Sequence, residues 1–392
     1  MFRYTVEKEK LCARFRASWR GAVARMVGAA TLAFSFSSCA ATAVEGPARG
    51  QEVLFFPSIA SVSSDNQCLL TIQGRVFEPT EKSRGREALI DGFALLVEAS
   101  RTDPLFRARA RYLLSDSNRN TRVSVKVGDR VILLPASDPA GYFTGDIALT
   151  SNEVRQLAKG GVISFQSGPT STNPQLFQGS VMFVPEEGVT VITDMDDTIK
   201  ITDILNHREK VANTFWRPFR AVPGMPALYR SWMEALGPRI HFHVVSAGPW
   251  QFNEPLRRFT EEADFPAFTW DMRSVDIGDG RVLLKEMFPD PYKFKLQKIR
   301  AFMARFPKRH VVLVGDSGEK DPEVYATILA EFPNRVDAVF IRNVSREDQK
   351  DRNDKLFTSK EAAAKLRVFL DPKELPPLTP PPVAQSANPP CN

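Results

Sequence analysis

The chain has 392 residues, of which 43% are hydrophobic and 25% are charged, the composition of an ordinary soluble globular protein. Its length exceeds what one hydrophobic core usually covers, so we expect two domains with tails. The net charge is +6, and much of this excess lies within the first 25 residues. Because the remainder is close to neutral, the sequence argues against a nucleic-acid-binding surface.

The first 45 residues have the pattern of an export signal. A basic segment precedes the uncharged stretch Met26–Ser38, which suits a signal sequence and is too short to span a bilayer. The segment ending Phe36-Ser-Ser-Cys39 is similar to a bacterial lipoprotein box and makes Cys39 a candidate for lipidation, although Leu is usual where Phe36 stands. Ala41-Thr-Ala43 offers ordinary secretory cleavage instead. We expect an exported protein in the periplasm or cell envelope, with a disordered basic leader as the alternative.

Residues 51–186 have the signals of a β-rich, sandwich-like domain. The run Cys68–Phe77 alternates between apolar and polar side chains. Shorter apolar runs, separated by Gly, Pro, Asn and Asp, follow at 121–127, 131–134, 161–165 and 180–184. Segments 93–102 and 106–112 also fit helices. In a strand, Arg107, Arg109 and Arg111 would share one face, most simply a solvated one.

The cysteines and histidines show no metal-binding spacing. The four cysteines form no C-x-x-C pair. Cys68 and Cys391 can pair in an oxidising compartment, and two unpaired thiols explain the sequence equally well. His241 and His243 alternate within an apolar run, where further zinc ligands are lacking, so we interpret them as strand residues.

Residues 187–370 change to apolar runs that alternate with helical patterns. The apolar runs lie at 189–193, 241–245, 310–314 and 336–341, and the helical segments at 226–236, 249–262, 293–306 and 321–332. This alternation predicts a Rossmann-like α/β domain, whose parallel sheet is covered on both faces and binds ligands at the carboxyl ends of its strands. Residues 371–392 are rich in proline and predict a disordered or extended tail.

An acidic motif, Asp194-Met-Asp-Asp-Thr198, directly follows the first of these strands. In an extended segment Asp194 and Asp196 point the same way and can face one pocket. Close carboxylates repel unless a cation lies between them, and Mg²⁺ prefers carboxylate and phosphate oxygens. We therefore expect Asp194 to attack phosphorus with Asp196 as acid and base. Ile199 and Leu205 exclude an EF-hand, which needs Gly and Glu there; a solvated acidic turn remains an alternative for the motif alone.

Two later side chains suit a phosphate. Ser246 ends the second strand, where its hydroxyl and the amides of the next helix can hold a phosphate oxygen, although serine is also a common helix cap. Lys295 precedes the third strand and supplies a cation that can orient Asp194 and neutralise phosphoryl charge. Lys293 and Lys298 compete for this role.

Two more acids follow the third strand, in Gly315-Asp-Ser-Gly-Glu-Lys-Asp-Pro322. Asp316 is placed for Mg²⁺, and Asp321 either supports the metal ligands from behind or caps the next helix. Acids at the ends of two strands, with a serine and a lysine between them in order, predict a phosphoryl-transfer site.

The order Asp-x-Asp-x-Thr, Ser, Lys, Gly-Asp-x-x-x-x-Asp resembles that of the haloacid-dehalogenase-like phosphatases. More narrowly, segments 194–200, 245–250, 315–325 and 341–344 are similar to those of the actin-patch-protein family of phosphatidate phosphatases, cousins of the lipins. The resemblance covers about 187–344 well and the preceding region more loosely. It implies Mg²⁺-dependent hydrolysis of phosphatidate, or another phospholipid at a membrane surface, to diacylglycerol and phosphate through an aspartyl-phosphate.

The resemblance also assigns roles by position. Asp194 is the nucleophile, Asp196 the acid and base, Ser246 a phosphate ligand and Lys295 the charge partner. The metal ligands are Asp194, Asp196 through its backbone carbonyl, and Asp316. We expect Thr198 and Ala247 to contact the substrate as well, although Ala247 and Gly248 stand where relatives often carry a polar residue.

Alternatives remain open at the level of the substrate and the activity. The stretch between Thr198 and Ser246 is too short for an independent capping domain, which leaves room for a bulky substrate. Phe215, Trp216, Phe219 and Trp250 form either an apolar rim or, more simply, part of the core. The substrate can instead be a protein, sugar or nucleotide phosphate, or the chain can be a catalytically silent envelope binding protein. No protein partner can be inferred.

Overall fold

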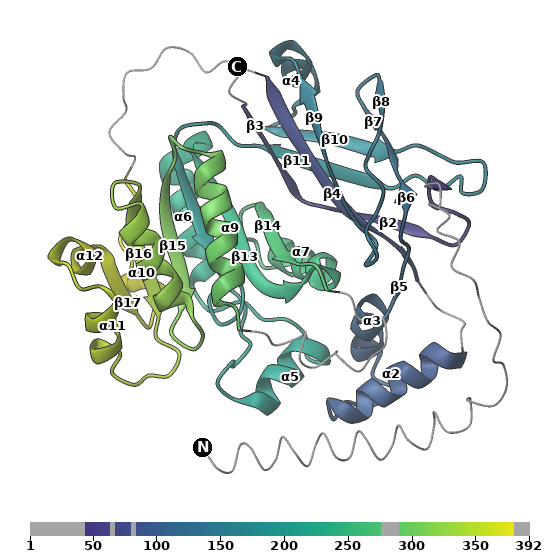
Figure 1. The fold of residues 1–392 in the computed structure, drawn as a ribbon. Coiled ribbons are helices and arrows are strands. Elements are labelled where there is room, and N and C mark those ends of the chain that lie inside the picture. The colour runs from purple at the N-terminus through teal and green to yellow at the C-terminus, as the bar shows by residue number, and fades with distance from the viewer. Residues whose placement is uncertain (1–43, 63–66, 80–83, 276–289, 380–392) are drawn as a thin grey trace, which may run out of the picture. The chain divides into compact units, whose positions relative to one another are not determined.

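The computed structural model describes residues 44–62, 67–79, 84–275 and 290–379 (Figure 1). Residues 1–43 of the expected export signal, including Cys39, lie outside these ranges, as does Cys391, so export, lipidation and the Cys68–Cys391 pairing stay predictions. Among the described residues, no helix is both long and apolar enough to cross a bilayer.

The β-rich character of this region is confirmed, but its strands form one nine-stranded mixed sheet rather than the two packed sheets of a sandwich. Its strands are β2 Glu52–Phe56, β3 Ser58–Val62, β4 Cys68–Glu78, β5 Asp116–Ser117, β7 Ser124–Val127, β8 Arg130–Leu133, β9 Tyr142–Leu149, β10 Val162–Ser167 and β11 Gln178–Phe183. Hydrogen bonds join them in the order β2-β4-β3-β11-β10-β7-β8, with β5 and β9 also on β4. A separate short pair joins β1 Val44–Glu45 to β6 Thr121–Arg122.

Strand β4 organises this sheet because it is long enough to pair along both edges. β9 pairs along one edge over Cys68–Arg75, and β3 and β2 pair with successive parts of β4. Pro57 separates β3 from β2, as expected of a residue that cannot donate to the ladder. Cys68, Leu70 and Ile72 alternate into a buried cluster. The nine strands therefore share one continuous sheet.

Three helices accompany this sheet: α2 Arg84–Leu96, α3 Pro104–Leu113 and α4 Ser151–Leu157. The helical alternative for 93–102 and 106–112 therefore holds in part, and the strand alternative for the arginine series is wrong. Asp103 starts α3, because its side chain accepts a hydrogen bond from the Phe106 amide and Pro104 occupies the first turn.

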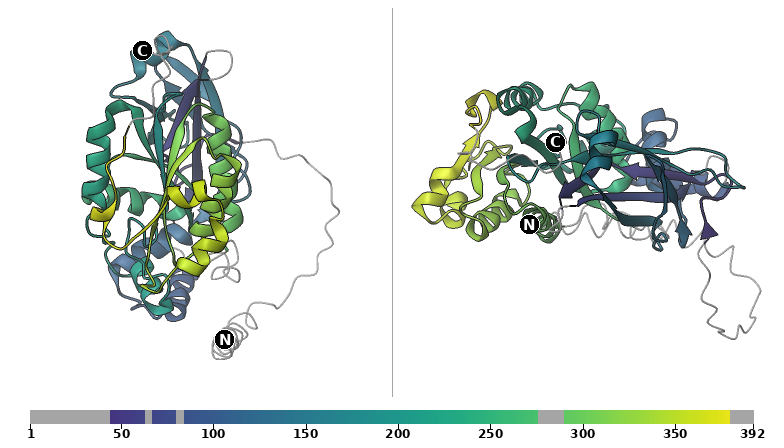
Figure 2. Two further views of the ribbon diagram at one scale, coloured as in Figure 1. Left: turned by 90° about the vertical axis from the view of Figure 1, so that its left-hand side faces the viewer. Right: turned by 90° about the horizontal axis from the view of Figure 1, so that it is seen from above.

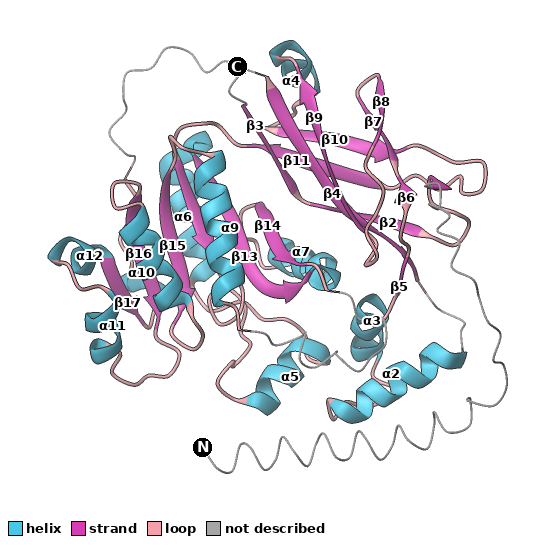
Figure 3. Ribbon diagram, in the orientation of Figure 1, coloured by secondary structure: helices cyan, strands magenta, loops and turns pink. Residues whose placement is uncertain are grey.

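The second half of the chain forms a six-stranded parallel sheet covered by helices on both faces (Figures 2 and 3). Its strands are β12 Val189–Thr193, β13 Ile240–Pro249, β14 Phe268–Arg273, β15 His310–Asp316, β16 Val336–Arg342 and β17 Leu366–Phe369. They lie in the order β14-β13-β12-β15-β16-β17. The order reverses beside β12, where open parallel sheets place their ligand sites.

Helices on the two faces bury two different clusters. α6 Met225–Leu236 and α7 Asn253–Glu262 pack on one face, while α9 Tyr292–Arg305 and α10 Asp321–Glu331 pack on the other. The predicted strands and helices thus occur within a few residues of their expected bounds. The sequence patterns missed β14 and β17, and the helices α5 His207–Phe215, α11 Lys350–Leu356 and α12 Lys360–Lys365.

The first part of the proline-rich segment is ordered, which corrects the expectation of a disordered or extended tail from residue 371. A short 3₁₀ turn covers Pro372–Glu374, and Leu375 is only 6% exposed. The indole Nε1 of Trp232 on α6 donates a 3.2 Å hydrogen bond to the carbonyl of Pro376. A buried indole needs such a partner. This hydrogen bond to Pro376 and the burial of the apolar Leu375 together anchor the segment.

Candidate active site

The loop that follows β12 forms the floor of the site. The amide of Asp194 donates to the carbonyl of Val314 on β15, so this residue still lies between the two central strands. Asp197 adopts a left-handed conformation with φ of +53°. Its carboxylate accepts hydrogen bonds from the amides of Thr202, Asp203 and Ile204. Asp197 thus holds the loop in shape, a role that the sequence motif alone did not reveal.

Lys295 joins the acids of two strand ends. Its Nζ lies 2.8 Å from Asp194 Oδ1, 2.5 Å from Asp321 Oδ1 and 3.8 Å from Glu319 Oε2. The other carboxylate oxygen of Asp321 accepts from the amide of Asp316 at 3.2 Å. One carboxylate oxygen from each of Asp194, Asp316 and Asp321 lies within 4.8 Å of the others. The structure thus brings together acids that are far apart in the sequence.

Only one of the three competing lysines enters this cluster. Lys295 is 1% exposed, whereas Lys298 pairs with Asp271 at 2.7 Å and Lys293 is exposed. All three belong to α9, which packs on the sheet through the face that also carries Leu296 and Ile299. Burial alone would lower the pKa of Lys295, but Asp194 and Asp321 raise it well above its ordinary value. Lys295 is therefore a firmly charged cation.

The carboxylates of the acidic cluster outnumber Lys295, the one cation that pairs with Asp194 and Asp321 there. Burial raises the pKa of Asp194 well above its ordinary value, while Lys295 acts in the opposite direction. Burial and the neighbouring Asp321 and Asp194 also raise the pKa of Asp316. Asp194 Oδ2 and Asp316 Oδ2 are buried and accept no hydrogen bond. Two unpartnered oxygens on carboxylates of one cluster fit a divalent cation, which would satisfy both.

Asp196 has a different environment, although it lines the same pocket as Asp194. Its Oδ1 lies 2.7 Å from the Nζ of Lys200 and accepts a hydrogen bond from the hydroxyl of Thr202. Burial alone would raise the pKa of Asp196, but Lys200 and Thr202 hold it below its ordinary value. Lys200 is itself 3% exposed. The two aspartates of the motif are therefore electrostatically distinct.

The remaining predicted residues divide into two groups. Ser246 and Ala247 line the pocket at the end of β13, and Ser246 Oγ accepts a 3.1 Å hydrogen bond from the Gly248 amide. Thr198 is fully buried without lining the pocket, and its Oγ1 has no hydrogen-bond partner. The expectation that Thr198 contacts substrate therefore has no direct support from the pocket walls.

One side of the pocket is apolar. Its apolar lining residues are Ile204, Phe219, Pro249, Phe252, Leu256 and Met272. Of the aromatic residues considered for a rim, Phe219 belongs to this wall, whereas Phe215 and Trp250 are buried in the core and Trp216 packs against it. The pocket therefore combines a charged floor with an apolar side.

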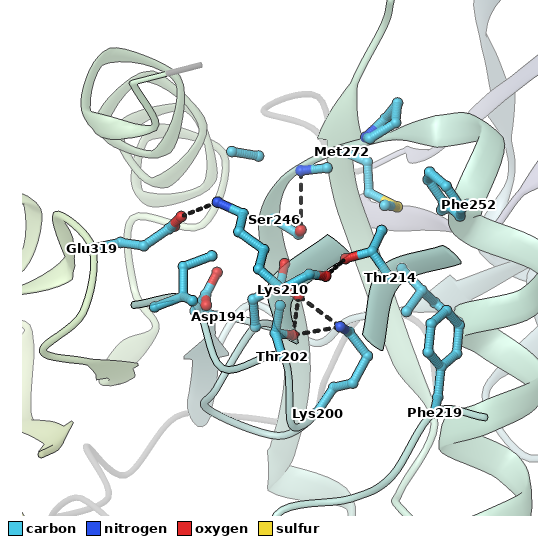
Figure 4. Close-up of a pocket in the computed structure, with 16 residues that line it drawn as sticks. Asp194, Lys200, Thr202, Lys210, Thr214, Phe219, Ser246, Phe252, Met272 and Glu319 are labelled. Carbon is cyan, nitrogen blue, oxygen red and sulfur yellow. Dashed lines mark hydrogen bonds and ion pairs between the residues drawn. The ribbon is translucent and has the colours of Figure 1, made fainter. Parts of the chain in front are cut away.

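A third lysine faces the acids across the pocket. Figure 4 shows Lys210 of α5 pointing toward Glu319, with a separation of 4.0 Å between Nζ and Oε1. Burial raises the pKa of Glu319 above its ordinary value. The sequence patterns did not single out Lys210 or Phe219, because α5 and the following loop carry no recognisable motif. Lys200 and Glu319 lay inside quoted motifs without an assigned role.

The histidines of β13 are structural, as expected. The hydroxyl of Thr269 on β14 lies 2.8 Å from both His241 Nε2 and His243 Nδ1. Burial lowers the pKa of His241 well below its ordinary value, so its ring stays neutral. Among the described residues, the acidic cluster at β12 and β15 is the one group with the arrangement of a metal site.

The fold and the site together define an α/β protein with acidic residues and a buried lysine at the carboxyl edge of its parallel sheet. Residues 189–343 match the family model described as "Phosphatidate phosphatase APP1, catalytic domain". This matched segment carries the whole acidic cluster, so its similarity to that family of catalytic domains includes the site.

Two fungal proteins are similar to the same part of the chain. An uncharacterized protein of Schizosaccharomyces pombe is 28% identical over 171 residues, and Phosphatidate phosphatase APP1 of Saccharomyces cerevisiae is 30% identical over 171 residues. The matches cover 43% and 41% of this chain and 27% of each relative. The chain therefore matches about a quarter of the length of these relatives.

Among solved structures, a β-glycosidase from Bacteroides vulgatus aligns over 80% of this chain and 37% of its own. It does so with a TM-score of 0.20 and 9% identity, which is too poor a superposition to indicate a shared fold.

Proposed function

We propose that this chain is a Mg²⁺-dependent phosphatidate phosphatase with a haloacid-dehalogenase-like catalytic domain. The observation that carries the proposal is the cluster of Asp194, Asp316 and Asp321 carboxylates within 4.8 Å of one another. Asp194 Oδ2 and Asp316 Oδ2 are buried there without a hydrogen-bond partner, while Lys295 holds the other oxygen of Asp194. The match of residues 189–343 to the APP1 catalytic-domain family supports the same reaction.

The donor set suits the proposed metal. Asp194, Asp316 and the backbone carbonyl of Asp196 would hold Mg²⁺, a hard cation that prefers oxygen ligands. The bound ion would offset the charge between the attacking carboxylate and the phosphate dianion. Asp321 takes no direct part, because Lys295 and the Asp316 amide already occupy its two oxygens.

The protein's own residues then divide the reaction into two displacements. Lys295 orients the Asp194 carboxylate, one oxygen of which attacks phosphorus to form an aspartyl-phosphate as the bond to the departing oxygen breaks. Asp196 donates a proton to the departing oxygen and later takes one from the water that hydrolyses the intermediate. The Lys200 ion pair favours the charged form of Asp196, which suits the base that this second step needs. Ser246 holds a phosphate oxygen.

The apolar wall supports a lipid substrate. Phe219, Phe252 and Leu256 line the pocket next to its charged floor, so a phosphate at Asp194 would place its ester group along apolar side chains. Removal of the phosphate from phosphatidate would give diacylglycerol. We further propose that the first 45 residues export the protein to the periplasm or cell envelope, where this substrate would be presented by a membrane. A soluble phosphomonoester is the alternative substrate.

The test is phosphate release by the full chain, with Mg²⁺ or EDTA, from phosphatidate in mixed micelles and from p-nitrophenyl phosphate. We expect turnover only with Mg²⁺, and Asp194→Asn should abolish it for both substrates while thermal unfolding stays cooperative. Asp129→Asn is the matched control, because Asp129 is exposed in the β7–β8 turn.

Three results would redirect the proposal. Normal turnover by Asp194→Asn would exclude the aspartyl-phosphate mechanism. Release from p-nitrophenyl phosphate alone would replace the lipid with a soluble phosphomonoester. A folded wild-type chain without turnover of either substrate would leave a binding protein as the better description.

A further inference from the structure

The region before the catalytic domain reaches the active-site pocket through one buried arginine. Because α3 is a helix, Arg107 and Arg111 lie one turn apart and both face Glu87, whereas Arg109 points to the opposite side. That side also carries the buried Phe106 and is packed against the rest of the molecule. Arg109 is only 4% exposed.

Arg109 is held by backbone carbonyls near the pocket. Its Nη1 donates to the carbonyl of Thr214 at 3.0 Å and to that of Arg217 at 2.9 Å, at the end of α5. Burial lowers the pKa of Arg109 to about 10, which leaves the side chain charged at neutral pH. A buried charge whose hydrogen bonds go to neutral carbonyls is costly, so its retention calls for a compensating contact.

That contact is the ring of Phe219. The guanidinium carbon of Arg109 lies 3.7 Å from the ring centroid, which is close for a cation–π pair. The Nζ of Lys200 lies 5.2 Å from the same centroid. Lys200 in turn holds Asp196 at 2.7 Å. Arg109, Phe219, Lys200 and Asp196 therefore form a connected series from α3 into the pocket.

We propose that Arg109 is a positioning residue for the proposed proton donor: it fixes Phe219 and the end of α5, which support Lys200 and thereby the Asp196 carboxylate. This inference rests on the proposed function. It gives α3 a part in the reaction, so the region before residue 187 contributes to the active site.

Two further contacts hold the same regions together. Phe56 of β2 stacks on Trp250 with ring centroids 4.2 Å apart, and the hydroxyl of Tyr142 donates to Gln251 Oε1 at 2.9 Å. Both join the nine-stranded sheet to the 3₁₀ turn Trp250–Phe252 that follows Ser246. Arg109 is thus the charged member of a larger set of contacts that fixes α3, β2 and β9 next to the pocket.

The test uses two esters that differ mainly in their leaving group, phenyl phosphate and p-nitrophenyl phosphate. Phenol is the poorer leaving group and depends more on a proton donor. We expect Arg109→Met in the full chain to lower kcat/KM about 10-fold for phenyl phosphate and about 2-fold for p-nitrophenyl phosphate. The larger loss is a part of the rate enhancement of about 10²–10⁴-fold that a positioned general acid provides. Arg109→Lys should recover most of the loss, because it restores a cation over the ring.

Arg111→Met is the matched control, since Arg111 lies on the same helix with a side chain that is 41% exposed, and it should leave both rates unchanged. Phe219→Leu tests the same series from the pocket side and should reproduce the selective loss, which guards against poor folding of Arg109→Met. An equal fall for both esters would indicate a merely structural role and overturn the inference. Absence of turnover by the wild type would instead count against the proposed function itself.

Discussion

Replacement of Asp316 by Asn should stabilise the metal-free protein while removing its response to Mg²⁺. The unpartnered Oδ2 of Asp316 would become an amide that can donate to the neighbouring carboxylates. Charged carboxylate oxygens within 4.8 Å of one another repel by at least about 3 kcal/mol at an effective dielectric constant of ~20. Because the raised pKa of Asp316 means that some of this charge is already lost, we expect a gain of about 1–2 kcal/mol. For a chain of this length that corresponds to a Tm increase of about 1–2 °C in EDTA.

The same variant should lose most of the stabilisation by metal. If Mg²⁺ binds the folded wild type only, 100 times its dissociation constant would stabilise the protein by about 2.7 kcal/mol through mass action. Asp316→Asn would lose most of this gain, because one of the oxygens that would bind the ion is replaced. Differential scanning calorimetry in EDTA and in Mg²⁺ measures both effects, with Asp129→Asn as the control for a simple change of charge. A metal-free Asp316→Asn that melts below wild type at pH 8 would refute the electrostatic argument.

The pH dependence gives an independent check. Burial raises the pKa values of Asp194 and Asp316. Their contribution to stability is therefore complete below the unfolded carboxyl pKa of about 4 and is lost as the pH rises through the raised folded values. The advantage of Asp316→Asn in EDTA should grow between pH 5 and pH 8.

Two other substitutions test how the site and the fold are supported. Gly315→Ala should lower kcat/KM at least ~10-fold, because the added Cβ would lie 2.4 Å from Asp321 Oδ2. Gly92→Ala is the control, since an added Cβ there meets open space and should leave kcat/KM unchanged. Equal kcat/KM values for the two variants would contradict the close approach of Gly315 to Asp321. Leu375→Ala should cost about 2–3 kcal/mol in urea unfolding, whereas the exposed Leu370→Ala should cost less than ~0.5 kcal/mol. Equal midpoints would show that residue 375 is not anchored.

Much of the acidic site could be predicted from the sequence because its residues directly follow strands. Asp194 and Asp316 come at the carboxyl ends of apolar runs, and parallel strands bring such ends to one edge of a sheet. The apolar runs themselves were recognisable, since the buried strands of a parallel sheet are apolar on both faces. The expectation that Asp194 and Asp196 share a pocket followed from alternation along an extended segment.

The lysine that completes the cluster needed the tertiary structure. Three lysines within one helical turn and a half are nearly equivalent in sequence, and only the packing of α9 on the sheet buries Lys295 and leaves Lys293 exposed. For a similar reason, the sequence left two roles open for Asp321, support of the metal ligands and capping of the next helix. Its contact with Lys295 joins α10 to α9, and no local pattern encodes the distance between two helices.

The arginines of α3 also show the difference between what the sequence predicts and what the tertiary structure decides. The sequence allowed this segment to be either a strand or a helix. The two-residue repeat of a strand and the 3.6-residue repeat of a helix would expose different sets of these arginines. Only the folded chain places Arg109 over Phe219, a residue more than a hundred positions away. Local patterns fix which side chains follow a strand or share a helix face, because these depend on backbone geometry. Contacts between separate elements depend on how their surfaces pack, so the tertiary structure alone decided which cations reach the acids.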